Sequence, residues 1–205
     1  MVDRRVLIPR PETEVVVDVA LAELAGLGAQ SPVVVDLGTG SGAIALSMAS
    51  EQVAAQFWAT DISEDALAVA SANLVGLGAR VGGRVRLVQG SWWRALPDAL
   101  RGSVDLVVTN PPYVAESELA DLPPEVSGWE PLQSLVPGPG GLEALEAVLR
   151  EAPEWVADRS AVVSEIAPSQ AGAAADLARC AGFQDVSVRK DLAGRARVLV
   201  ARGRR

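Results

Sequence analysis

The sequence contains no histidine among its 205 residues, and this absence limits the chemistry that the chain can perform. Histidine is the side chain most often used as a general base near neutral pH and as a ligand of transition metals. Any catalysis must therefore depend on carboxylates, or on the positioning and polarisation of a reactant. No metal site is expected.

Cysteine is nearly absent as well. Cys180 is the single cysteine, so no disulfide can form within the chain. It falls in a helical pattern over residues 171–181, where we expect it to be a small buried residue.

Long apolar runs are also missing. Asp, Glu or Gly interrupts each apolar stretch within about ten residues, well short of the ~20 residues that a membrane-spanning helix needs. The first ten residues are charged rather than signal-like. We therefore expect a cytoplasmic protein that does not interact with a membrane.

The chain has no excess of basic charge. Its net charge is −8 and its isoelectric point is near 4.6, whereas nucleic-acid-binding proteins usually carry a clustered basic face. Direct binding to nucleic acid is therefore not expected. Arginines do gather near the two ends of the chain, and the last three, Arg202, Arg204 and Arg205, are expected to form a solvated tail.

The composition is that of a globular protein, with 49% hydrophobic and 21% charged residues. The length suits one domain, 1–205, made of an N-terminal segment and helix (1–30) and a Rossmann-like core (31–205). Apolar patterns predict helices at 12–27, 43–48, 64–77, 141–151 and 170–181, and strands at 33–37, 56–60, 84–89, 104–109, 161–166, 183–189 and 197–201. This alternation predicts an α/β fold with a doubly wound, mostly parallel sheet of seven strands, whose last two form a hairpin-like pair. The irregular segment 123–140 is long enough to cover a site.

A glycine-rich loop, 36–42 (DLGTGSG), follows the first of these strands. Glycines let a ligand approach the backbone, and Asp61 closes the next strand, where an acid can accept hydrogen bonds from ribose hydroxyls. The spacing differs from the Gly-x-Gly-x-x-Gly of NAD enzymes. Because Asp36 would repel a pyrophosphate and suits a cationic cofactor, the loop favours S-adenosylmethionine. The alternative is a plain turn, with Asp61 as a helix cap.

A second motif, Asn110-Pro111-Pro112-Tyr113, follows the strand predicted at 104–109. Two prolines hold the chain in a stiff, extended conformation as it leaves the sheet. The Asn110 side-chain oxygen and the Pro111 carbonyl could then accept the two hydrogens of a planar amide NH2, with the ring of Tyr113 as a wall. The alternative is a strand that ends in a rigid turn.

Together these motifs make the chain resemble the class I S-adenosylmethionine methyltransferases. More narrowly, it resembles the PrmC (HemK) family, which methylates the glutamine side-chain amide of peptide chain release factors. This resemblance implies the glutamine of the release factor's Gly-Gly-Gln motif as the target. The resemblance covers nearly the whole chain. It rests on residues 7–14 (LIPRPETE), 36–42, 61–63 (DIS), 110–113 (NPPY), 130–132 (EPL), 141–142 (GL) and 190–195 (KDLAGR).

The resemblance implies a set of site residues. The cofactor, S-adenosylmethionine, would be held by Asp36, Gly38, Thr39, Gly40, Ser41, Gly42, Asp61, Ile62, Trp92 and Asn110. The glutamine would be held by Arg10, Glu14, Asn110, Pro111, Pro112 and Tyr113, of which Asn110, Pro111 and Tyr113 would be catalytic.

The chain departs from the family at two places. Ser91 stands where relatives often have an acid, so a hydrogen bond to the adenine amino group is not assured. The alternative for Trp92 and Trp93 is that both belong to the core. Full-length members also carry an additional N-terminal helical domain that grips the release factor. Here the catalytic part begins within a few residues of Met1, so we expect substrate binding to be weaker or differently supplied.

An amide nitrogen is a poor nucleophile, and the hypothesis is that Asn110 and the Pro111 carbonyl favour positive charge on it as they aim it at the methyl donor. The alternatives are an adenine-N6 methyltransferase acting on DNA or RNA, a cofactor-binding module without catalysis, and an NAD-binding protein.

Overall fold

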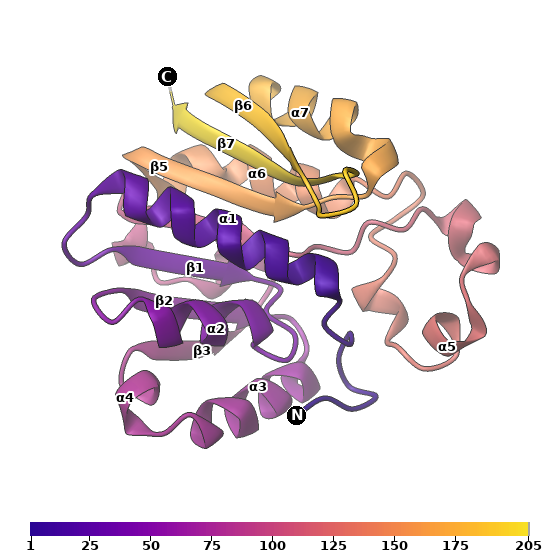
Figure 1. Ribbon diagram of the computed structural model, residues 1–205, viewed down its shortest axis with the longest axis horizontal. Helices are drawn as coiled ribbons and strands as arrows, with labels where there is room; N and C mark the ends of the chain where they lie inside the picture. Colours follow the sequence, from indigo (N-terminus) through magenta and orange to yellow (C-terminus); the bar gives the residue numbers. More distant parts are fainter. Residues whose placement is uncertain (205) are drawn as a thin grey trace.

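The computed structural model describes residues 1–204, and its centre is one seven-stranded sheet with the order β3-β2-β1-β4-β5-β7-β6 (Figure 1). β7 is antiparallel to both of its neighbours, β5 and β6, and the other pairs are parallel. The predicted class I fold, with a mostly parallel sheet and an antiparallel C-terminal strand, is confirmed. The strands are β1 (Val33–Leu37), β2 (Gln56–Asp61), β3 (Val85–Gln89), β4 (Val104–Thr109), β5 (Val156–Glu165), β6 (Phe183–Lys190) and β7 (Ala196–Arg204).

Helices cover both faces of the sheet. The α-helices are α1 (Pro11–Leu27), α2 (Ala43–Glu51), α3 (Glu64–Gly76), α4 (Ala79–Gly82), α5 (Pro124–Ser127), α6 (Glu143–Trp155) and α7 (Ala171–Cys180). The 3-10 helices are η1 (Trp92–Ala95), η2 (Asp98–Leu100), η3 (Glu116–Asp121), η4 (Leu132–Ser134) and η5 (Pro168–Gln170). None of the helices within residues 1–204 is long and apolar enough to cross a membrane.

Local sequence signals explain where helices begin and end. α1 starts with Pro11 and carries Glu12 and Glu14 in its first turn, where acids interact favourably with the helix dipole. Its C-cap is Gly28, whose φ of 67° is left-handed. α3 starts after Ser63, whose hydroxyl accepts a hydrogen bond from the backbone N–H of Ala66.

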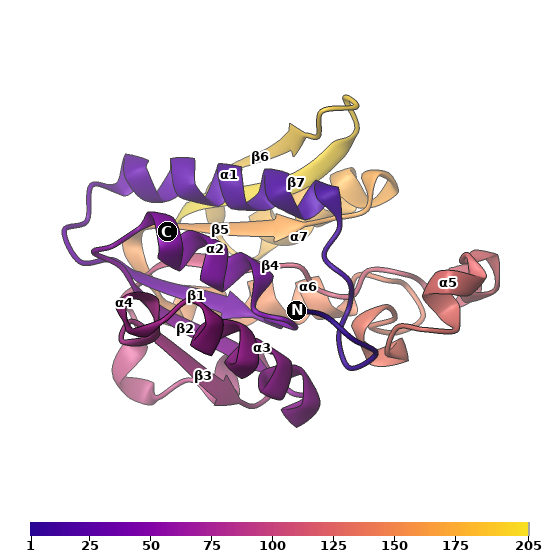
Figure 2. The same cartoon turned by 60° about the horizontal axis from the view of Figure 1, so that its bottom comes forward.

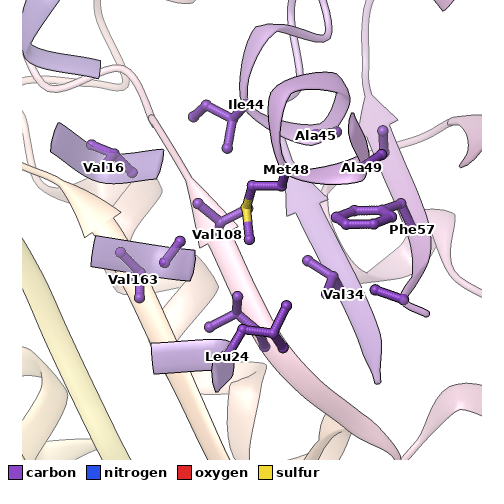
Figure 3. Close-up of a cluster of buried hydrophobic side chains, with 14 of the residues drawn as sticks. Val16, Leu24, Val34, Ile44, Ala45, Met48, Ala49, Phe57, Val108 and Val163 are labelled. Carbon is purple, nitrogen blue, oxygen red and sulfur yellow. The ribbon is translucent and has the colours of Figure 1, made fainter. Parts of the chain in front are cut away.

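The alternation of side chains along the strands builds two apolar cores. In β1, Val34 packs on the side of α1 and α2, whereas Val35 and Leu37 pack on the side of α6 and α7. Figure 3 shows the first core, in which Met48 of α2 lies near Val34 and Val108. Burial on both faces explains why these strands read as continuous apolar runs.

The structure corrects two expectations near the C-terminus. Arg202 does not belong to a solvated tail, because it lies in β7 and its guanidinium pairs with Glu23 (2.6 Å) and Asp185 (2.8 Å). Arg204 ends the same strand, and Arg205 lies outside the described residues. Cys180 is exposed rather than buried, because it ends α7 on the face that points away from the sheet.

The segment 116–140, which contains the short helices η3, α5 and η4, projects from the sheet beside the N-terminal residues 1–10, as both ribbon views show (Figures 1 and 2). The Arg10 guanidinium donates to Glu130 at 2.6 Å, and the backbone N–H of Ile8 donates to the same carboxylate oxygen at 3.3 Å. Arg4 lies over the ring of Trp129, 4.1 Å from its centroid. These contacts join two segments that are more than a hundred residues apart in sequence.

Candidate active site

A cavity of about 400 Å³ opens at the carboxyl ends of four neighbouring strands. Gly38, Asp61, Gly90 and Asn110 line it, and each lies at or directly after the end of β1, β2, β3 or β4. Ligands of open α/β sheets bind at this edge, where the strand order reverses. The segment 123–140 contributes Pro131, Gln133, Ser134, Val136 and Pro137, so it covers the cavity as expected.

The glycine loop is fixed by hydrogen bonds to the neighbouring strand. The backbone N–H groups of Gly38 and Thr39 both donate to the Thr60 carbonyl, at 2.9 and 2.8 Å. Gly38 has a φ of 76°, and a Cβ at this position would lie 3.4 Å from the indole of Trp92. Glycine therefore allows both the turn and the close approach of the ring. Thr39, Gly40 and Ser41 also line the cavity.

Asp36 lies beneath this loop, and it is not among the residues that line the cavity in the described chain. One carboxylate oxygen accepts hydrogen bonds from the Thr39 hydroxyl (2.7 Å) and from the backbone N–H of Ala45 (3.2 Å). Burial raises the pKa of Asp36 to about 7. The residue thus ties the loop to the first turn of α2, and Gly42, also off the cavity wall, is the N-cap of that helix.

Asp61 links the loop to the start of α3. Its two oxygens accept the backbone N–H of Gly40 (2.8 Å) and of Ser63 (2.9 Å). Each carboxylate oxygen has a further lone pair, so the side chain can still accept hydrogen bonds from a ligand. Ile62, next in sequence, lines the cavity with 62% of its surface exposed.

The two adjacent tryptophans have different environments. Trp93 is fully buried, donates its indole N–H to the Val148 carbonyl at 2.9 Å and stacks on Trp155. Trp92 lines the cavity and has a φ of 46°, the one positive value at a non-glycine residue among residues 1–204. Such strain is concentrated at functional sites. Ser91 also lines the cavity.

The tetrapeptide meets the glycine loop because β1 and β4 are parallel neighbours. Thr109, the last residue of β4, donates its hydroxyl to the Leu37 carbonyl at 2.6 Å. Asn110 and Pro112 line the cavity. The Asn110 side-chain oxygen is buried without a hydrogen-bond partner in the described part of the chain, which marks it as an acceptor for a ligand N–H.

Other predicted substrate residues lie around this wall. Within the described chain, neither Pro111 nor Tyr113 lines the cavity, and the Tyr113 hydroxyl faces Glu165 at 3.5 Å. Arg10 and Glu14 line a neighbouring hollow of about 290 Å³. The two spaces are adjacent, because Pro9, Thr13 and Ala43 line both.

Glu143, at the start of α6, is a cavity residue that the sequence did not indicate. One of its oxygens accepts the backbone N–H of Gly140 at 2.7 Å, and the other is buried without a hydrogen-bond partner in the described residues. Hydrogen bonds from Gly140 and the following backbone N–H groups lower the pKa of Glu143. The cavity therefore has a second unpaired acceptor in addition to the Asn110 oxygen.

Comparison with known proteins identifies the family. Residues 17–122 match the family described as "Methyltransferase small domain". The chain is 44% identical over 201 residues to the release factor glutamine methyltransferase of Cereibacter sphaeroides, covering 98% of this chain and 68% of that protein. It is 45% identical over 193 residues to the protein of the same name from Bordetella pertussis, covering 94% and 68%.

The chain belongs to the release factor glutamine methyltransferase family. It spans about two thirds of the length of these curated relatives. Membership of this family, together with the fold, implies the use of S-adenosylmethionine.

Solved structures agree on the fold of this family member. One is the hMettl16 catalytic domain in complex with an RNA hairpin of the MAT2A 3′UTR, with a TM-score of 0.74 and 15% identity, covering 100% of this chain and 74% of that one. Another is the ribosomal protein L11 methylase from Lactobacillus delbrueckii, with a TM-score of 0.65 and 18% identity, covering 97% and 81%. Identities this low concern the fold alone.

Proposed function

We propose that this protein transfers a methyl group from S-adenosylmethionine to the side-chain amide nitrogen of a glutamine in a peptide chain release factor. The observation that carries the proposal is the Asn110 side-chain oxygen, which is buried and unpaired at the wall of the cavity beside the glycine loop. Such an acceptor suits an N–H donor, and a side-chain amide NH2 offers two N–H bonds in one plane.

The cavity has the features that a nucleoside cofactor needs. The backbone at Gly38 and Gly40 can approach the methionine part closely, Asp61 has lone pairs free for ribose hydroxyls, and the Trp92 ring can flank adenine. When bound, the cofactor supplies a methyl group on a sulfonium, which is a strong electrophile. Asp36 would act indirectly, by shaping the loop from below.

The protein side of the reaction is positioning. The nitrogen lone pair of an amide is delocalised into its carbonyl, so acceptors on both N–H bonds favour the build-up of positive charge on the nitrogen. In this proposal the Asn110 oxygen accepts one N–H of the amide and directs the lone pair at the methyl group. The Pro111 carbonyl is the expected acceptor of the other N–H, although Pro111 does not line the cavity in the described chain. The proton can leave after the transfer, when the nitrogen is far more acidic. This order requires no strong base, which suits a chain without histidine.

The test is to incubate the protein with methyl-labelled S-adenosylmethionine and a release factor, and to locate the label by mass spectrometry. The matched substrate is the same release factor with the glutamine of its Gly-Gly-Gln motif changed to alanine. We expect one methyl group on that glutamine and none on the altered factor. Label in DNA or RNA but not in the release factor would replace this proposal with an adenine-N6 methyltransferase.

A further inference from the structure

Tyr113, the single tyrosine of the chain, is held at both ends by residues outside the cavity. Its backbone carbonyl accepts a hydrogen bond from the Gln170 side-chain amide at 2.8 Å, and the same amide nitrogen donates to the Gly141 carbonyl at 3.0 Å. Its hydroxyl faces a carboxylate oxygen of Glu165 at 3.5 Å. The backbone and the side chain of this residue therefore have separate anchors.

The anchoring carboxylate is itself buried and fixed. Glu165 ends β5 with 1% of its surface exposed, and its second oxygen accepts the Thr13 hydroxyl at 3.0 Å. Thr109 of β4 pairs with Ser164 of β5. Glu165 and Asn110, the residues that follow them, therefore lie side by side. Burial raises the pKa of Glu165, and the Thr13 hydroxyl and the charge of Arg197 oppose the rise. The hydroxyls of Thr13 and Tyr113 face the two oxygens of this buried group.

Gly141, in the loop before α6, packs closely against the backbone of the tetrapeptide. Gly141 has a φ of 77°, and a Cβ there would lie 2.7 Å from the Tyr113 carbonyl oxygen and 2.9 Å from the Gln170 amide nitrogen. The loop before α6 therefore packs directly on the backbone of Tyr113. Movement of this residue would disturb α1, β5 and the loop before α6 together.

We propose that Glu165 is a positioning residue for methyl transfer, which, with Thr13 and Gln170, fixes Tyr113 and thereby the place of the substrate amide beside Asn110. This inference rests on the proposed function. Glu165 does not itself line the cavity, and in this proposal it acts through the tyrosine. Precise placement matters because small displacements of a reactant are costly in rate.

The first test measures the contact without any activity. Incorporation of 3-fluorotyrosine places one fluorine label in the protein, at Tyr113. We expect its ¹⁹F resonance at neutral pH to shift and broaden in Glu165→Gln, and in Thr13→Val as a second variant. Glu146→Gln, at an exposed position of α6, is the matched control and should leave the resonance unchanged. An unchanged resonance in both test variants would overturn the inference.

The second test separates positioning from a role in the fold. We expect Glu165→Gln to lower kcat roughly tenfold, the effect of about one lost hydrogen bond to a charged group, without a change in the affinity for S-adenosylmethionine. In the Tyr113→Phe background the same substitution should cost little more, because both changes break one interaction. Effects that multiply instead would mean that Glu165 acts independently of Tyr113, and they would overturn the inference. If the wild-type protein methylates no glutamine, the proposed function fails, while the fluorine experiment still tests the contact.

Discussion

The pH dependence of folding stability gives a direct check on the role of Asp36. Burial raises the pKa of this carboxyl from an ordinary value of 3.8 to about 7. The folded chain therefore binds the proton of Asp36 more tightly than the unfolded chain does. The stabilisation is fully present below pH 3.8 and is lost as the pH rises toward 7. Because one pH unit corresponds to about 1.4 kcal/mol, the loss over this interval is on the order of 4 kcal/mol.

The perturbation is Asp36→Asn. The amide oxygen can still accept hydrogen bonds from Thr39 and Ala45, and the side chain no longer titrates. The assay is urea unfolding at a series of pH values between 4 and 8 for the wild-type protein and the variant. Relative to the wild type, the variant should gain about 4 kcal/mol in free energy of unfolding across this range. Asp121→Asn, at an exposed position, is the control and should follow the wild type. Parallel curves for Asp36→Asn and the wild type would refute the reasoning.

Two further substitutions test the cavity and its cover. Trp92→Ala should weaken S-adenosylmethionine binding roughly 10- to 100-fold in calorimetry, because base–aromatic stacking is worth about 1–3 kcal/mol. Trp92→Gly should lose as much affinity as Trp92→Ala. Its free energy of unfolding should be higher than that of Trp92→Ala by roughly 1 kcal/mol, because glycine tolerates the φ of 46° found here. Equal free energies of unfolding would argue against backbone strain at this position. Glu130→Gln should break the ion pair with Arg10 and raise amide hydrogen exchange in both segments 1–10 and 116–140. Exchange that rises in neither segment would show that the pair does not hold them together.

Most of the fold could be predicted from the sequence, because its signals are local. The apolar runs 33–37 and 104–109 are strands covered on both faces, and the glycine and proline motifs that follow them come together because β1 and β4 pair in parallel. The resemblance across seven motifs predicted the family. The joining of Asn110 to the glycine loop follows from strand order, which the doubly wound pattern indicated.

The direction of individual side chains was harder to predict. Asp36 lies two residues after Val34 in β1, so both side chains point to the same face of the sheet, toward α2. This direction places Asp36 beneath the loop rather than in the cavity. Trp92 and Trp93 are adjacent, and only the left-handed backbone at Trp92 separates a cavity residue from a core residue. Both cases depend on the backbone conformation at the end of a strand, which the residue type alone does not specify.

Long-range polar contacts gave no signal in the sequence. The pairing of Arg10 with Glu130 and the burial of Glu165 beside Thr13 join residues that are more than a hundred positions apart. Arg202 was misassigned to a tail for the same reason, since its partner Glu23 is far away in sequence. A single charged residue reads as exposed until its partner is known.

The central claim is that Asn110 positions the substrate amide and contributes little to the affinity for the cofactor. The most direct measurement compares Asn110→Ala with the wild-type protein in single-turnover methyl transfer to a release factor, alongside calorimetric titration with S-adenosylmethionine. We predict a loss of at least about 100-fold in the rate of transfer, with cofactor affinity largely retained. Turnover by the variant equal to that of the wild type would contradict the account.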